Sequence, residues 1–150
     1  MSSFAAWRRR WRRPKRGVAR GVAVYGSLGY DDPEKLQELL AKHNQVPQWA
    51  AERNLLMNKD PESLLVIDGA LNEWKVDPLI GHKLTNEVGL YLGNMMVKNI
   101  DGAHWTVWPN GHPVVVLNSG TEMDVTDLVR RRLQVSGRSL PDVYSQALNE

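Results

Sequence analysis

The strongest constraint on the fold is a change of hydrophobic period at Ala103. From there to Val125 the chain reads AHWTVW, PNG, HPVVVL, NSG and TEMDV, so short β-prone runs alternate with glycine-containing turns. This pattern is typical of three short strands joined by tight turns, and Asn110-Gly111 is the strongest hairpin signal in the chain. The sequence therefore predicts a three-stranded antiparallel meander.

A two-residue loop at Asn110-Gly111 leads to a definite register. Trp105 would then face Val116 and form a core surface on one side of the meander. The opposite side would be more apolar than a solvent-exposed face should be, so we expect something to cover it or to bind there. The residues of this candidate ligand or interface face are His104, Trp108, His112, Val115 and Leu117.

Helices are expected before and after the meander. Pro33, Pro47 and Pro61 stand at positions typical of helix starts, and the second of these helices is expected to extend through Met57. Two further helices should follow the meander, one capped by Thr126 or Asp127 and one formed by residues 140–148.

A longer helix is predicted over residues 85–100, with two glycines four residues apart. Gly89 and Gly93 remove side chains from one strip of this helix, so another element can approach its backbone closely. Because glycine costs a helix about 1 kcal/mol relative to alanine, we expect a packing reason for both. The predicted fold class is therefore α+β, with helices packed on a three-stranded antiparallel meander.

The net charge of +2 divides into two unlike parts. Residues 1–20 carry eight basic side chains and no acidic one, whereas the remaining 130 residues carry eleven basic and all seventeen acidic side chains. A segment of charge +8 thus precedes a body of charge −6. We interpret residues 1–19 as a basic arm, flexible or ordered by a partner, and residues 20–150 as a single α+β domain.

The arm has the composition of a short amphipathic helix over residues 3–13. Its aromatic anchors fall at i, i+3 and i+7 on one face: Phe4, Trp7 and Trp11. The basic residues expected to bind an anionic surface fill the rest: Arg8, Arg9, Arg10, Arg12, Arg13, Lys15 and Arg16. A helix of about three turns is marginal alone in water, so we expect it to order only against a partner.

Several partners fit the arm. Lipid headgroups accept tryptophan and arginine together, nucleic acid accepts arginine on phosphate and tryptophan on unpaired bases, and an acidic protein offers carboxylates. The simplest alternative is that the arm packs on the acidic body of its own chain or of a second copy. A homodimer would also suit an apolar second face of the meander. An acid-free, arginine-rich start is also typical of a mitochondrial presequence.

The residue inventory favours no catalytic centre. Because the chain has no cysteine, disulfides, thiolate nucleophiles and cysteine-ligated metals are excluded. His104 and His112 lie too far apart on the predicted hairpin to share an ion, so we expect no metal site and no cofactor. Ser119, His112 and Asp124 could form a hydrolytic triad, but local turn structure explains each of them better. Asp68 could form an acid–base pair with Glu73 or Asp77, although a capping or solvent-facing role is favoured.

No run of residues approaches the roughly 18 consecutive apolar positions that a membrane-spanning helix needs. We therefore expect a cytoplasmic protein that its arm could hold at the inner face of a membrane.

The run LYLGNMMVKNIDGAHWTVWPNGHPVVVLNSGTEMDV resembles a small family of actinobacterial proteins of unknown function. These share a Trp- and Arg-rich start leading into RGVAV, an SL-containing helix, a YLG helix and a GAxWxxWPNGxPVVxLxSGxxxDV meander. The matching segments here are residues 20–24, 63–68, 91–93 and 102–125. The resemblance implies a bacterial cytoplasmic setting and carries over no catalytic residue.

These observations lead us to expect a non-catalytic binding or adaptor domain, tethered through its arm to an anionic surface, either a membrane or an acidic protein. One alternative is a nucleic-acid-associated protein that uses the arm on phosphate. Another is a small-ligand sensor or an enzyme that uses the meander face around Trp108 and His112.

Overall fold

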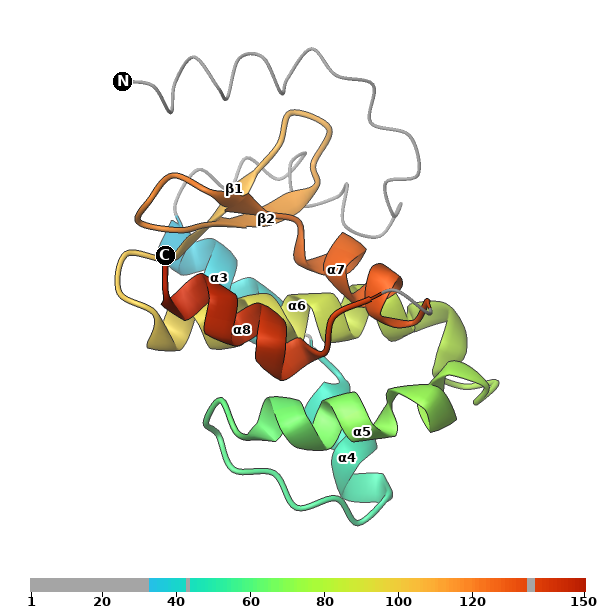
Figure 1. Cartoon of the computed structure of the whole chain (residues 1–150). Helices are drawn as coiled ribbons and strands as arrows, with labels where there is room; N and C mark the ends of the chain where they lie inside the picture. The colour runs from blue at the N-terminus through green and yellow to red at the C-terminus, as the bar shows by residue number, and fades with distance from the viewer. Residues whose placement is uncertain (1–32, 43, 135–136) are drawn as a thin grey trace.

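The computed structural model describes residues 33–42, 44–134 and 137–150, which form six α-helices, one 3-10 turn and a three-stranded sheet (Figure 1). The elements in chain order are α3 (Pro33–Lys42), α4 (Val46–Glu52), α5 (Ser63–Lys75), η1 (Gly81–Lys83), α6 (Leu84–Asn99), β1 (His104–Val107), β2 (Pro113–Val116), β3 (Glu122–Met123), α7 (Val125–Arg132) and α8 (Leu140–Leu148). The predicted α+β class is confirmed.

Helix α6 is the centre of this arrangement. It contacts each of the other five described α-helices and also β1 and β2. Figure 1 shows the sheet on one side of α6 and the helices α4 and α5 on the other. Val88, Leu92 and Met96 of α6 are fully buried in one hydrophobic core cluster to which all six helices contribute. Burial of this kind provides most of the stability that a short helix has in a folded protein.

The sheet is the predicted antiparallel meander, in the order β1-β2-β3, but its register differs from the expected one. Trp105 pairs with Val115, and Val107 pairs with Pro113. The expected partner of Trp105, Val116, pairs with His104 instead. The predicted register is therefore wrong by one residue, and such a slip moves side chains to the opposite face of a strand.

The loop between β1 and β2 explains the difference. The backbone N–H of Trp108 donates to the carbonyl of His112 over 2.9 Å, and the N–H of Gly111 donates to the carbonyl of Trp108 over 2.8 Å. Three residues therefore form the loop, and only Gly111, with a φ of +86°, adopts a left-handed conformation among them. Pro109 suits the second position of such a turn, where its fixed φ is favourable and no N–H is required. A two-residue loop would instead need a positive φ at Asn110.

Helix α4 ends earlier than the sequence suggested. Asn54 has a φ of +56°, its N–H donates to the carbonyl of Ala51 over 3.1 Å, and the N–H of Leu55 donates to the carbonyl of Ala50 over 2.9 Å. This pair of bonds around a left-handed residue is the Schellman motif, which terminates a helix and reverses the chain. The predicted extension of this helix through Met57 is wrong, and residues 53–62 form a loop.

The two glycines of α6 have the packing role that was expected. A Cβ atom on Gly89 would lie 2.6 Å from Cα of Thr126, at the start of α7. A Cβ atom on Gly93 would lie 2.2 Å from Cη2 of Trp105, which is fully buried on β1. The absence of side chains at these two positions lets α7 and the sheet reach the surface of α6.

Of the two C-terminal helices, α8 agrees with its prediction and α7 differs from it at its first turn. Helix α8 has the predicted bounds, and the side chain of Ser139 caps its N-terminus by accepting from the N–H of Asp142. Helix α7 begins slightly earlier than expected, because Asp124 is its cap and accepts from the N–H of Asp127 over 3.2 Å. The predicted cap at Thr126 or Asp127 is wrong, since both lie inside the first turn of α7.

Gly93→Ala should destabilise the fold by about 1–3 kcal/mol, because the added methyl group displaces the buried Trp105 ring. Gly69→Ala in α5 is the matched control, since a Cβ there has nothing within 4 Å and alanine favours a helix by up to about 1 kcal/mol. Urea denaturation followed by circular dichroism measures both free energies of unfolding. Equal effects of the two substitutions would contradict the close contact.

The Asp77 carboxylate predicts a pH dependence of stability. The backbone N–H of Leu79 and the Arg53 guanidinium, which is 2.5 Å away, hold the pKa of Asp77 below its usual 3.8. Because the pKa is lowered in the folded state, the charged form stabilises the fold above about pH 4, and this contribution is lost as the pH falls through the lowered pKa.

Asp77→Asn should therefore lower the Tm at pH 7, and the difference from the wild type should shrink once the pH falls below 3.8. Thermal unfolding measured at a series of pH values from 7 to 2.5 tests this. A Tm difference that stays constant over the whole range would disprove it.

Candidate functional site

The arm predicted to bind an anionic surface, residues 1–19, lies outside the described residues. The second group of predicted site residues lies within them, but these residues do not form one face. Val115 and Leu117 belong to the hydrophobic core together with Trp105, whereas His104 is exposed and pairs with Val116. The prediction that His104, Trp108, His112, Val115 and Leu117 share one face is wrong, because the three-residue loop shifts the register of β2.

His112 lies instead at a polar junction between the β1–β2 hairpin and α7. Its side chain is 5% exposed, and its Nε2 atom lies 2.7 Å from Oδ1 of Asp124. The hydroxyl of Thr126 donates to the same carboxylate oxygen over 3.1 Å. The ring of Trp108 lies 5.4 Å from the imidazole, and its Nε1 donates to Glu122 over 3.1 Å. The contacts of His112 thus join the β1–β2 hairpin to the start of α7, and the bond of Trp108 joins it to β3.

The geometry of this junction does not resemble a hydrolytic triad. A triad needs a carboxylate on one imidazole nitrogen and a nucleophile on the other. Here Asp124 contacts Nε2, Thr126 lies 3.4 Å from the same atom, and Nδ1 of His112 is buried without a hydrogen bond in the described part of the molecule. Ser119 interacts with Thr121 instead, in the β2–β3 turn. The sequence favoured local structure over a triad, but it did not predict the contact between His112 and Asp124.

Asp68 has a structural role as well. Its Oδ1 accepts from Nε of Arg132 over 2.8 Å and from the backbone N–H of Leu140 over 2.9 Å. A single carboxylate on α5 thereby joins α7 and α8, with side-chain exposures of 14% for Asp68 and 20% for Arg132. A second carboxylate, the possible acid–base partner Asp77, is itself paired with Arg53.

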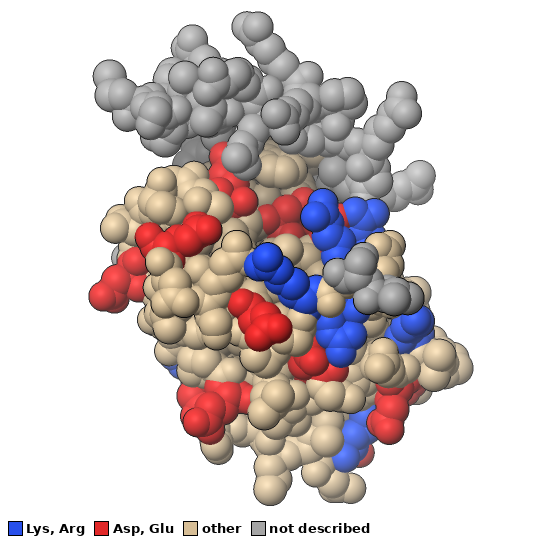
Figure 2. Space-filling model, in the orientation of Figure 1, with Lys and Arg blue, Asp and Glu red and all other residues tan. Residues whose placement is uncertain are grey.

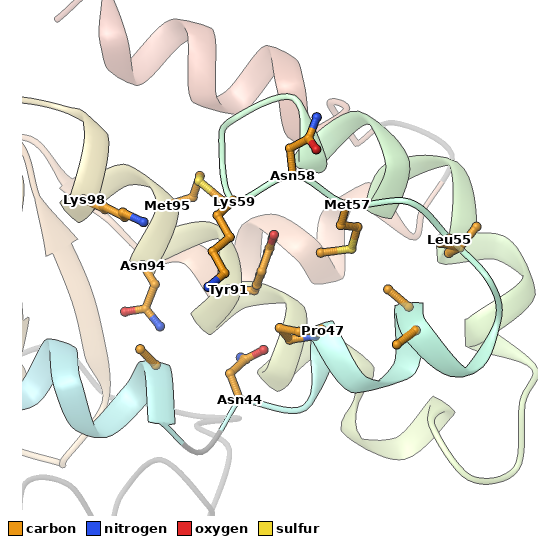
Figure 3. A pocket seen from close by; sticks show the side chains of 13 residues that line it. Asn44, Pro47, Leu55, Met57, Asn58, Lys59, Tyr91, Asn94, Met95 and Lys98 are labelled. Carbon is orange, nitrogen blue, oxygen red and sulfur yellow. The ribbon is translucent and has the colours of Figure 1, made fainter.

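A pocket of about 520 Å³ lies on the side of α6 that faces away from the sheet. It is formed between α6, α4 and the loop that follows α4 (Figure 3). Helix α6 contributes four residues at i, i+3, i+4 and i+7: Tyr91, Asn94, Met95 and Lys98. Helix α4 and the chain before it contribute Ala41, Asn44, Pro47, Ala50 and Ala51, and the loop contributes Leu55, Met57, Asn58 and Lys59. The volume is in the range of small-molecule sites.

Hydrogen bonds to neighbouring elements hold the wall of the pocket in place. The hydroxyl of Tyr91 lies 2.7 Å from the hydroxyl of Ser63, at the start of α5. Oδ1 of Asn94 accepts from Nε1 of Trp105 over 2.9 Å. Burial raises the pKa of Tyr91 above 10.0, so its phenol is neutral at physiological pH. The wall is therefore ordered and uncharged along most of α6.

The charge of the lining is concentrated in two lysines. Lys59 and Lys98 line the pocket, and none of the other described residues that line it is an Asp or a Glu. Figure 3 shows Lys59, Asn94 and Lys98 toward one end of the pocket, and Leu55 and Met57 toward the other. The pocket thus combines a cationic end with an apolar end.

Sequence analysis missed this pocket. The available signal was the second stripe on α6, in which Tyr91, Asn94 and Lys98 recur at helical spacing among otherwise apolar positions. Interpreting Leu55 and Met57 as part of a helix hid the loop that closes the pocket.

Residues 33–42, 44–134 and 137–150 contain no group of three or more metal-ligating side chains placed to hold an ion. They also contain no helix with the length and apolar character required to cross a bilayer.

The fold and pocket define an α+β domain built around one central helix. The chain belongs to a family of unknown function, DUF6278, whose model matches residues 3–150. This confirms the resemblance to a family of unknown function. Searches of curated proteins and of solved structures found no match.

Asp68→Ala should lower the free energy of unfolding by about 1–3 kcal/mol, because it leaves the Arg132 guanidinium and the Leu140 N–H without their acceptor. Asp101→Ala, in the exposed turn before β1, is the control and should stay within about 0.5 kcal/mol of the wild type. Chemical denaturation measures both. A loss no larger for Asp68→Ala than for Asp101→Ala would refute a structural role for Asp68.

Proposed function

We propose that this protein is a non-catalytic binding domain which its basic arm holds at an anionic membrane surface. One observation carries the proposal: residues 1–20 contain eight basic and no acidic side chains, with aromatic residues at positions 4, 7 and 11. Arginine pairs with lipid phosphate and tryptophan favours the headgroup region, so the combination suits a bilayer interface.

The charge distribution of the body supports this role for the arm. On the face drawn in Figure 2, basic side chains gather near α7 and acidic side chains lie among them. Arg130 and Arg131 both pair with Asp127, and Arg132 pairs with Asp68. Two carboxylates thus offset two of these three positive charges, which favours the arm as the part that attracts an anionic surface.

The polar clusters of the body support a binding role rather than an enzymatic one. The contact between His112 and Asp124 joins the β1–β2 hairpin to α7, and Asp68 joins α5 to α7 and α8. The carboxylates of Asp124 and Asp68 are both engaged in these contacts. A general acid or base needs a group that can reach a substrate proton. The 4% exposure of His112 leaves little access for one.

Replacing five arm arginines by glutamine in the full chain (R8Q, R9Q, R10Q, R12Q and R13Q) should weaken binding to vesicles of phosphatidylglycerol and phosphatidylcholine at least a hundredfold. Each basic residue near such a surface contributes on the order of 1 kcal/mol. Vesicle co-sedimentation at two salt concentrations measures the partition coefficient. Trp7→Ala with Trp11→Ala should weaken binding and abolish the blue shift of tryptophan emission.

Arg130→Gln with Arg131→Gln is the control, because it removes charge from α7 and leaves the arm intact; binding should change less than threefold. Vesicle binding that survives the five arm substitutions would overturn the proposal. Salt-dependent binding to single-stranded RNA without vesicle binding would also overturn it, in favour of a nucleic-acid-associated protein.

A further inference from the structure

We infer that the pocket between α4 and α6 binds a small amphipathic anion, with its apolar part against Leu55 and Met57 and its charged group at Lys59 and Lys98. This site is distinct from the arm and does not depend on the membrane proposal. The volume of about 520 Å³ accommodates a ligand of the size of a medium-chain carboxylate.

The charge of the lining selects an anion. Lys59 and Lys98 reach the pocket from different elements, a loop and a helix, and none of the described lining residues is acidic. Burial raises the pKa of Tyr91, and the one carboxylate whose charge is seen to act on a described lining residue, that of Asp60, raises it further. No carboxylate pairs with either lysine within the described part of the chain. The charge of this cationic end is opposite in sign to that of residues 21–150 as a whole, which carry a net charge of −6. Two unpaired ammonium groups beside an apolar surface attract a ligand of opposite charge.

The remaining lining selects an apolar body. Leu55, Met57 and Met95 supply aliphatic and thioether groups, and Ala50 and Ala51 of α4 leave room beside them. Methionine side chains adapt to ligands of different shape at low cost, so this surface suits a chain or ring better than a strongly polar molecule. Figure 3 shows Leu55 and Met57 toward the end of the pocket that is opposite Lys98.

Part of the pocket wall is preorganised, because hydrogen bonds to neighbouring elements fix it. Tyr91 is held by Ser63 and Asn94 by Trp105, so two wall positions lose little freedom on binding. The same lysines disfavour the basic arm as an occupant, because its seven positive charges would be repelled. The occupant is therefore a separate molecule that carries negative charge.

The test is calorimetric titration of the full chain with decanoate below its micelle concentration. Decanoate should bind, whereas decyltrimethylammonium, with the same chain and the opposite charge, and acetate, without the chain, should not. Lys59→Gln with Lys98→Gln should weaken decanoate binding at least tenfold. Ala51→Phe, at an exposed position of α4 that lines the pocket, should abolish it.

Lys35→Gln with Lys75→Gln is the control with the same change of charge outside the pocket, and it should alter binding less than twofold. The five arm substitutions should also leave decanoate binding unchanged, which separates this site from the arm. The inference is overturned if decanoate does not bind, if decyltrimethylammonium binds equally well, or if the pocket and control lysine variants behave alike. Circular dichroism of each variant confirms that it is folded.

Discussion

The contact between Trp105 and Gly93 is the constraint on which the rest of the fold depends. A large aromatic ring on β1 lies directly against the backbone of α6, where any side chain would occupy the same space. The ring is 1% exposed, and its only polar atom, Nε1, is satisfied by Asn94 one residue further along the helix. Close packing and a satisfied buried hydrogen bond thus coincide in one interaction, which sets the distance between the sheet and the central helix.

This contact occupies one side of α6, and the opposite side of the helix lines the pocket. At about 100° per residue, Gly89 and Gly93 lie nearly opposite the stripe formed by Tyr91, Met95 and Lys98. The first side receives α7 and the sheet, and the second side faces α4 across the pocket. One helix therefore organises the core and also forms a wall of the candidate binding site. Substitutions on its two sides should have separable effects on stability and on ligand binding.

Much of the secondary structure could be predicted from local signals. Pro33 begins a helix, Ser139 caps another, and the glycine-separated runs after Ala103 form the meander, because these signals act over a few residues. The register could not be predicted from Asn110-Gly111 alone, since that pair fits both two-residue and three-residue loops, and Pro109 favours the longer one.

The pocket was beyond sequence reasoning for a different reason. It requires α4 to stop at a left-handed Asn54, so that the following loop returns across α6. Asparagine tolerates that conformation without demanding it, so the residue alone does not predict the reversal. The polar clusters show the same limit: His112 and Asp124 are twelve residues apart, and only the folded hairpin brings them within 2.7 Å.

The hydrogen bond between Trp105 and Asn94 also has a kinetic consequence. The indole proton is enclosed between the sheet and α6, so it can exchange with solvent deuterium only when these two layers separate. The acceptor of this proton, Asn94, also lines the pocket, so one side chain belongs both to the packed interior and to the cavity wall. The exchange rate of the indole proton reports how often the central helix parts from the sheet.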